Sequence, residues 1–203
     1  MKKILIAFAS LLVLGGCYPG GAEYVEDTDV IYTTYDEAYD FSSKGTYAMP
    51  DKIVVDVDID RGDTTFVYMR EAFATPILAA IKSNMEAYGW SQVDVDDNPD
   101  VVLTPAGIES TTFFYSYWYD WWYYGWGWGW YYPPYYPVVS SYTTGTFVIA
   151  IADPSMADDS PINKSPTVWF SAANGLVSGA YDISRVTESI DQSFKQSPYL
   201  QTN

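Results

Sequence analysis

The sequence predicts an α+β fold in which two helices pack on one face of a mainly antiparallel sheet. Two segments, residues 75–89 and 184–196, carry apolar side chains at the spacing of an amphipathic helix. Apolar, β-branched or alternating runs predict strands at residues 53–59, 65–68, 101–103, 145–152 and 167–172. Helices and strands do not alternate strictly along the chain, which favours α+β over a parallel α/β sheet.

The first strand and the segment after it predict a hairpin. Between residues 53 and 59 apolar residues alternate with aspartate, as at Val55 and Asp56, so one face of the strand becomes polar. Arg61-Gly62-Asp63 has the composition of a turn. Residues 65–68 then return as a partner strand or lead into the following helix.

The first helix is predicted to begin at Thr75 and to end at Gly89. Thr75 is a suitable N-cap, and Pro76 is favoured at the first helical position, where its missing N–H costs nothing. Glycine at residue 89 is typical of a helix C-terminus because it adopts a left-handed conformation without strain. A start near Tyr68, with Pro76 as a kink inside the helix, is the alternative.

The N-terminus predicts an export signal. Lys2 and Lys3 are followed by an uncharged apolar run of eleven residues, Ile4–Leu14. Eleven helical residues span about 16 Å, whereas a membrane-spanning helix needs about 20 residues. The segment therefore fits a cleaved signal and not an anchor helix.

The segment Leu14-Gly15-Gly16-Cys17 resembles the bacterial lipobox, in which the cysteine thiol is acylated and becomes the mature N-terminus. Cys17 is the only cysteine in the chain and is the predicted lipidation site, through which the protein is held to a membrane. Gly15 departs from the usual alanine or serine. Tyr18 comes next, so the aspartate that retains many lipoproteins at the inner membrane is missing. The resemblance therefore implies the outer membrane.

The chain is accordingly divided into three parts. Residues 1–16 are predicted to be the lipoprotein signal peptide, residues 17–38 an acidic flexible tether, and residues 39–200 a single α+β domain. The tether prediction depends on a Pro-Gly-Gly segment and on a high density of aspartate and glutamate, which favour solvated chain. The length suits one domain with a core of its own.

Composition excludes several classes of function. The formal net charge is −16, which repels phosphates, so we expect no nucleic acid partner. Without histidine or a second cysteine, Ser-His-Asp and Cys-His catalysis, disulfides and zinc–cysteine clusters are not available. A glycoside hydrolase with paired carboxylates is the enzyme class left, yet no carboxylate lies in a motif that requires a raised pKa. We therefore predict a non-enzymatic protein with no catalytic residue.

Clustered aspartates raise the alternative of calcium binding. Four aspartates between residues 56 and 63 follow a D-x-D-x-D-x-x-D pattern, but Arg61 stands where the EF-hand loop has glycine and Val67 where it has glutamate. A solvated hairpin is the favoured interpretation. Residues 94–100 are interpreted as a loop with turn chemistry. Weak calcium binding by Asp-rich loops, such as the one that carries Asp153, Asp158 and Asp159, is an alternative; otherwise no metal and no cofactor is predicted.

Residues 113–136, here called the aromatic insert, interrupt the domain. Seventeen of these 24 residues are aromatic, and Asp120 is their only charge. An aromatic ring stacks on sugars and suits wet interfaces and membrane boundaries. The segment is interpreted as a contact surface for a partner or the membrane, as an unspecific loop, or as a carbohydrate-binding platform. Its candidate binding residues are six tryptophans: Trp118, Trp121, Trp122, Trp126, Trp128 and Trp130.

Several short motifs, in their order, resemble a known family. They are Tyr39-Asp40-Phe41-Ser42-Ser43, Thr46-Tyr47-Ala48, Tyr88-Gly89-Trp90, Asn98-Pro99-Asp100-Val101-Val102, Gly145–Asp153, Val168-Trp169-Phe170 and the closing helix before Ser197-Pro198. Over about residues 36–200 the chain resembles the bacterial lipoproteins that carry the domain of unknown function DUF4136. The resemblance implies a periplasmic or outer-membrane lipoprotein with a compact α+β domain, and it transfers no catalytic residue.

The predicted function is that of an outer-membrane-anchored lipoprotein, a non-catalytic interaction or structural module of the cell envelope. Whether the domain faces the periplasm or the cell exterior is left open. Its expected partners are the membrane, through lipid on Cys17, and an envelope protein or a glycan. A carbohydrate-binding lipoprotein that uses the aromatic insert is the alternative, and a carboxylate-based glycoside hydrolase is a weaker one.

Overall fold

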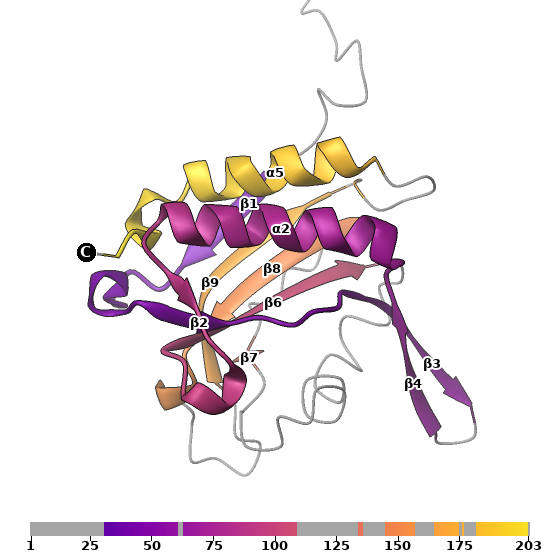
Figure 1. The fold of residues 1–203 in the computed structure, drawn as a ribbon, viewed down its shortest axis with the longest axis horizontal. Helices are drawn as coiled ribbons and strands as arrows, with labels where there is room; N and C mark the ends of the chain where they lie inside the picture. The colour runs from indigo at the N-terminus through magenta and orange to yellow at the C-terminus, as the bar shows by residue number, and fades with distance from the viewer. Residues whose placement is uncertain are drawn as a thin grey trace, which may run out of the picture.

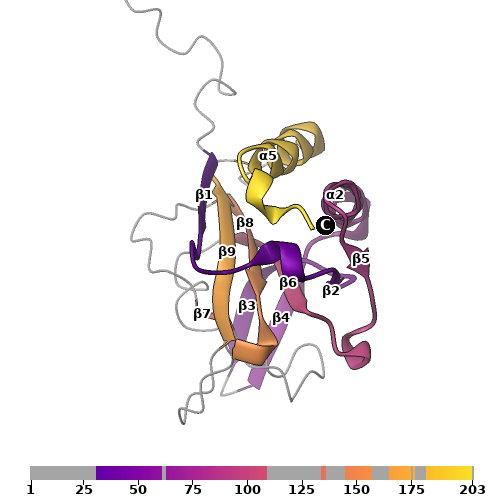
Figure 2. The same ribbon diagram turned by 90° about the vertical axis from the view of Figure 1, so that its left-hand side faces the viewer.

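The computed structural model describes residues 31–60, 63–108, 134–135, 145–156, 165–174, 176 and 182–202. Within them, a β-sheet carries two α-helices on one of its faces (Figures 1 and 2). The helices are α2 (Glu71–Ala87) and α5 (Ile183–Lys195). The strands are β1 (Ile31–Tyr35), β2 (Thr46–Ala48), β3 (Val54–Asp60), β4 (Asp63–Tyr68), β5 (Ser91–Gln92), β6 (Val101–Ile108), β7 (Pro134–Tyr135), β8 (Thr146–Ala152) and β9 (Ser165–Ala173). Short 3-10 turns are η2 (Phe41–Ser43), η3 (Val95–Asp97), η4 (Pro154–Met156) and η5 (Pro198–Leu200).

The sheet combines long antiparallel ladders with short parallel ones. Its main order is β1-β9-β8-β6-β2-β5, and the β3–β4 hairpin joins it through β3 and β6. The ladders β1–β9, β9–β8 and β8–β6 are antiparallel, whereas β2 pairs in parallel with β5 and β6. In the sequence, α2 lies between β2 and the strands β5 and β6. Because the helix returns the chain to the start of the sheet, β5 and β6 run in the same direction as β2. The predicted α+β class is confirmed, and the sheet is mixed.

Strand β1 lies within the segment that the sequence predicts to be tether. Ile31 pairs with Ala173 and Tyr35 with Trp169, so the strand forms one edge of the sheet. Residues 31–35, which lie within the predicted tether, are therefore part of the sheet. The acidic neighbours of this segment favour solvated chain, but its β-branched and aromatic residues suit a half-exposed edge strand.

Helix α2 begins earlier than its N-terminal signals predict. It starts at Glu71, after Arg70, and Pro76 lies inside it. The predicted start at Thr75 is wrong, and the alternative start near Tyr68 is closer. Pro76 removes one intrahelical hydrogen bond, but the longer helix also buries Ala74 in the core. The predicted end is confirmed: Gly89 has a φ of 90° and donates its N–H to the Glu86 carbonyl.

The predicted hairpin and C-terminal helix are both present. Strands β3 and β4 pair antiparallel along their length, with a bulge near Val54. Helix α5 begins at Ile183, one residue before the predicted start, and the carboxylate of Asp182 caps it by accepting the Ser184 N–H. No helix in the described part of the chain is long and apolar enough to cross a membrane.

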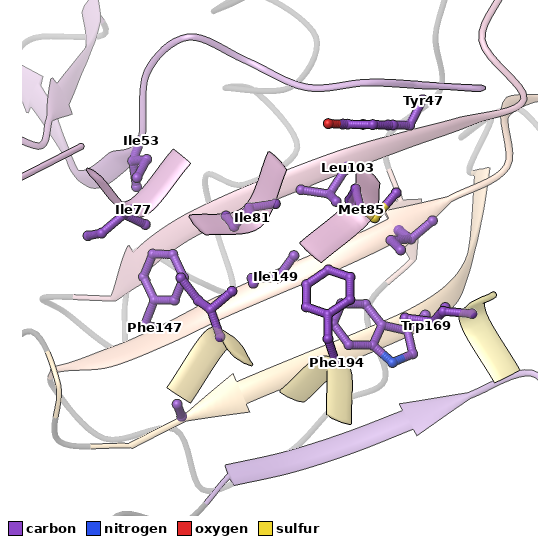
Figure 3. Packing of buried hydrophobic residues seen from close by; sticks show 14 of the residues in the cluster. Tyr47, Ile53, Ile77, Ile81, Met85, Leu103, Phe147, Ile149, Trp169 and Phe194 are labelled. Carbon is purple, nitrogen blue, oxygen red and sulfur yellow. The ribbon is translucent and has the colours of Figure 1, made fainter. Parts of the chain in front are cut away.

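The main core lies between the two helices and one face of the sheet (Figure 3). Alternate residues of the central strands, such as Leu103, Ile149 and Trp169, point towards α2 and α5. The buried indoles are also hydrogen-bonded: Trp169 Nε1 donates to Ser197 Oγ at 2.9 Å, and Trp90 Nε1 donates to the Leu200 carbonyl at 2.7 Å. These bonds attach the C-terminal residues to the core and satisfy polar groups that burial would otherwise penalise.

Candidate functional site

The residues that the sequence predicts to bind lie outside the described part of the chain. Cys17 and the six tryptophans of the aromatic insert are among them. The structure does describe where the chain leaves the sheet and returns to it, because Ile108 at the end of β6 pairs with Thr146 at the start of β8. Within the insert it describes only Pro134–Tyr135, which form β7 beside Ser165–Pro166 of β9.

The described residues contain a polar cluster centred on Asp153, at the end of β8. This carboxylate is 1% exposed. Its Oδ2 accepts hydrogen bonds from Tyr39 Oη at 2.7 Å and from Lys44 Nζ at 2.9 Å. Its Oδ1 accepts from the Ser155 N–H at 2.8 Å and from Ser155 Oγ at 2.6 Å. A buried carboxylate with this many donors is held in one position.

The hydrogen bonds decide how these groups titrate. Burial alone raises the pKa of Asp153, but the bonds from Ser155, Lys44 and Tyr39 outweigh burial and lower the pKa. Burial and the bond to the Asp153 carboxylate both raise the pKa of the Tyr39 hydroxyl. Asp153 is therefore the ionised acceptor and Tyr39 a neutral donor near neutral pH.

A second carboxylate, Asp100, joins the loop before β2, which also contains Lys44, to the start of β6. Its Oδ2 accepts from the Gly45 N–H, the Thr46 N–H and Thr46 Oγ1, each at 2.9 Å. Thr46 Oγ1 in turn accepts the Asp100 N–H at 3.0 Å. Burial raises the pKa of Asp100, but these bonds and the nearby charge of Lys44 lower it overall. Asp100 and Asp153 together hold the loop before β2 against β6 and β8.

A hollow of about 480 Å³ lies beside the two carboxylates. This volume is within the range of small-molecule sites, about 300–1,000 Å³. Asn98, whose φ of 57° is left-handed, turns the chain at its wall. The hollow is lined by Lys44, Val95, Asp96, Asn98, Pro99, Asp100, Pro154 and Ser155. Its charged groups include one ammonium and two carboxylates, which suits a polar ligand rather than an apolar one.

A wider hollow of about 750 Å³ shares Val95 with the first one. Its lining mixes Lys52 and Lys82 with several aspartates, and Lys52 Nζ lies 5.2 Å from the centre of the Tyr68 ring. Cations and anions are interleaved here, so neither sign of charge dominates the surface. The geometry offers no preference for an anionic or a cationic ligand.

The predicted acidic loops take structural roles where they are described. Asp94 caps η3 by accepting the Asp96 N–H, as expected for turn chemistry. Asp153, considered for calcium, faces the ammonium of Lys44 instead. Asp158 and Asp159 lie outside the described residues, as do the side chains of Asp58, Asp60 and Asp63. In the part of the chain that is described, no group of three or more acidic residues is arranged to hold a metal ion.

The fold and these motifs can be compared with known proteins. The model of the family described as "Domain of unknown function (DUF4136)" matches residues 31–199. The chain belongs to the DUF4136 family. The match begins at Ile31, which is also the first residue of β1.

One solved structure supports this assignment, and two others are more distantly similar. A DUF4136 family protein from Bacteroides thetaiotaomicron is 33% identical, with a TM-score of 0.67 over 85% of this chain and 97% of that one. A PelC dodecamer from Paraburkholderia phytofirmans is 12% identical, with a TM-score of 0.40 over 86% and 99%. A PDZ domain protein from Parabacteroides distasonis is 16% identical, with a TM-score of 0.44 over 84% and 36%. The last two scores are too low to support an argument. Among curated proteins, none matches the chain.

The polar cluster of this DUF4136 domain was not predicted from the sequence. Tyr39, Asp100 and Asp153 lie inside the motifs that carry the family resemblance. Those motifs do not indicate that the three side chains belong to polar clusters in the folded domain. No sequence pattern around Lys44 predicts its ion pair. Its partner Asp153 is 109 residues away, and only the pairing of distant strands brings the two together.

Proposed function

We propose that this DUF4136 protein is an outer-membrane-anchored lipoprotein whose domain is a non-catalytic interaction or structural module of the cell envelope. Two observations from the sequence support the anchor, namely the lipobox-like segment that ends at Cys17 and the absence of aspartate at residue 18. One structural observation supports the interaction module. Ile108 pairs with Thr146, so the ladder β6–β8 is complete at the point where the chain leaves β6 towards the aromatic insert. The sheet thus fixes Ile108, before the aromatic insert, and Thr146, after it, next to each other.

The carboxylates of the polar cluster support a non-catalytic role. The acid of a glycoside hydrolase needs a raised pKa so that it is protonated near neutral pH. Asp100 and Asp153 both have a lowered pKa, and their oxygens accept hydrogen bonds from the loop before β2 and from Ser155. These groups hold loops in position, which favours a binding or structural role over hydrolysis.

Carbohydrate binding is the second candidate, and the density of tryptophan in the aromatic insert favours it. Indole rings stack on sugar faces, and six of the eight tryptophans of the chain lie in this insert. A glycan array with the pure protein addresses this candidate. Binding that disappears when Trp126, Trp128 and Trp130 are changed to Ala supports it. Glycan hydrolysis that a single carboxylate substitution abolishes would overturn the non-catalytic proposal.

The anchor is tested by mass spectrometry of the mature protein and by membrane fractionation. We expect an acylated N-terminal cysteine and recovery with the outer membrane. Cys17→Ser should abolish acylation and membrane recovery. Tyr18→Asp keeps the acylated cysteine and is a matched control, expected to move the protein to the inner membrane. An unmodified Cys17 in the mature chain contradicts the proposal.

The proposed contact between the aromatic insert and an envelope partner is tested by affinity capture from intact envelopes with the acylated protein. A specific envelope component should be retained by the wild type and lost with Trp126, Trp128 and Trp130 changed to Ala. The variant Ala79→Glu, on the exposed side of α2, is the control and should retain it. Equal retention by both variants would remove the aromatic insert from the contact.

A further inference from the structure

The hollow beside Asp100 and Asp153 lies at one end of the sheet, where β6 begins and β8 ends. Its wall comes from separate parts of the chain, namely the loop before β2, the segment from η3 to the start of β6, and η4. A volume of about 480 Å³ is enclosed between them. Concave sites in which polar groups from several segments converge are typical of ligand binding.

One wall of the hollow presents an ammonium that is held from behind. Lys44 Nζ donates to the buried Oδ2 of Asp153 at 2.9 Å and lies 5.5 Å from the centre of the Tyr39 ring. An ammonium has three N–H donors, so the bond to Asp153 leaves the others for a further acceptor. Lys44 also lines the hollow. Because the polar cluster already fixes this ammonium, little conformational freedom is lost when it binds a ligand.

The same hollow presents acceptors that are also held in position. Asp100 Oδ2 accepts its hydrogen bonds from Gly45 and Thr46, whereas no bond from the described residues reaches Oδ1. Ser155 Oγ donates its only proton to Asp153 Oδ1 at 2.6 Å. Towards a ligand this hydroxyl is therefore an acceptor. Asp100 and Ser155 both line the hollow.

The segment around η3 adds further polar side chains. Asp96 and Asn98 are exposed and line the hollow. In the part of the chain that the structure describes, neither side chain has a hydrogen bond or an ion pair. The Asn98 amide can both donate and accept. Val95, Pro99 and Pro154 supply the apolar part of the lining.

The charges of the wall restrict the class of ligand. Asp153 balances the charge of Lys44, so Asp96 and Asp100 leave an excess of negative charge that disfavours phosphates and carboxylates. An amine carries only donors, and it would face the ammonium of Lys44 without offering it an acceptor.

A ligand that is neutral and carries hydroxyls avoids both conflicts. Each hydroxyl donates and accepts, so it can pair with Lys44 and with Asp100 alike. A zwitterion also carries groups for both, but its carboxylate loses hydration to meet an ammonium that is already paired. The wall therefore favours a neutral polyol over the three charged classes.

We propose that this hollow binds a neutral polyhydroxylated ligand, of the class of a single sugar residue. Lys44 and Asn98 donate to its hydroxyl oxygens, and Asp100 Oδ1 accepts a hydroxyl proton. Its C–H groups lie against Pro99 and Pro154. This inference goes beyond the proposed function. It depends neither on the lipid anchor nor on the aromatic insert, because every residue of the hollow lies outside residues 1–17 and 113–136.

Saturation-transfer difference NMR tests the class of ligand. The sample is the full mature protein in deuterated detergent. The neutral probes are the methyl glycosides of glucose, galactose, mannose and N-acetylglucosamine, and the charged probes are glucuronate, free glycine and putrescine. We expect at least one neutral glycoside to bind about tenfold more tightly than any charged probe, a difference of about 1.4 kcal/mol. Binding of no neutral glycoside, or tighter binding of a charged probe, overturns the proposal.

Two substitutions test whether the glycoside binds in this hollow. Asn98→Gly removes the amide and keeps the backbone, because glycine adopts a φ of 57° without strain. Asp96→Ala removes a carboxylate of the hollow. We expect each to weaken binding about fivefold, as for the loss of one hydrogen bond. The matched control is Asp97→Ala, which removes the adjacent exposed carboxylate, lines only the wider hollow and should leave the affinity unchanged.

A further variant separates this site from the aromatic insert. With Trp126, Trp128 and Trp130 changed to Ala, the protein should bind the glycoside as the wild type does, whether or not the insert contacts an envelope partner. If this variant loses binding while Asn98→Gly and Asp96→Ala retain it, the hollow is not the site. Unchanged affinity in all of these variants also contradicts the proposal.

Discussion

Lys44 Nζ lies 2.9 Å from Asp153 Oδ2, and the two side chains differ sharply in exposure. The lysine side chain is 23% exposed, so its ammonium reaches the surface, whereas the aspartate side chain is 1% exposed. The pair joins the loop before β2 to the end of β8. Because the carboxylate is buried, removal of its cation leaves a charge that water does not compensate.

Lys44→Met should therefore destabilise the domain markedly. We expect the free energy of unfolding to fall by about 3 kcal/mol, the lower end for a broken buried pair, because Tyr39 and Ser155 still donate to Asp153. Urea denaturation measures this change. The control is Lys82→Met, which removes an exposed ion pair with Glu86 at 3.9 Å and should cost less than about 1 kcal/mol. Equal effects of the two substitutions would refute the difference in burial as the cause.

Stability should fall in acid because of Asp100 and Asp153. Both have a lowered pKa in the folded protein, whereas an aspartate in the unfolded chain has a pKa of about 3.9. Their contribution is present above that unfolded pKa and is lost as the pH falls through the lower folded value. Asp100→Asn should flatten the decline of the unfolding free energy below about pH 4. Urea midpoints measured across this range give the slope, and an unchanged slope speaks against the assignment.

Tyr47 is a buried residue whose hydroxyl works against stability. Its side chain is 0% exposed, and within the described residues its Oη has no hydrogen-bond partner. Burial raises the pKa of Tyr47 to about 12, with a smaller contribution from the charge of Glu86. Tyr47→Phe removes the unsatisfied group and should be neutral or stabilising by about 1 kcal/mol.

Tyr88→Phe is the matched comparison for this substitution. Tyr88 Oη donates to the Phe194 carbonyl at 2.7 Å, so loss of its hydroxyl should destabilise by about 1 kcal/mol. Thermal and urea unfolding of the two variants should thus give effects of opposite sign or of clearly different size. If Tyr47→Phe is the more destabilising of the two, its hydroxyl has a partner that the described residues do not provide.

Gly89 should tolerate no side chain at the end of α2. Its φ of 90° is strained for other residues, and a Cβ at this position would collide with Thr202 Oγ1. We expect Gly89→Ala to lower the unfolding free energy by at least about 1 kcal/mol. Gly45→Ala is the control, since a Cβ there meets no atom within 4 Å. A similar loss of stability in both variants would exclude the left-handed conformation and the Thr202 contact as its cause.

Predictions from the sequence succeed where the signal is local. The end of α2 at Gly89, the span of α5 and the β3–β4 hairpin each depend on neighbouring residues and were predicted within a few positions. The start of α2 was not, because Thr75-Pro76 is a valid N-terminal signal that tertiary packing of Ala74 overrides. The place of β1 in the sheet was not predicted for a similar reason: its acidic surroundings indicate solvated chain, and its pairing with the distant β9 joins it to the domain.

By itself the sequence determined the α+β class, the two helices and the family motifs, together with the absence of histidine and of a second cysteine. These properties follow from composition and from periodicities that a short segment carries alone. Only the tertiary structure decided the parallel pairs of β2, the cluster of Lys44 with Asp153, and the burial of both faces of the sheet. Each of these depends on residues that are far apart in the chain, and local patterns do not specify which distant strands will pair.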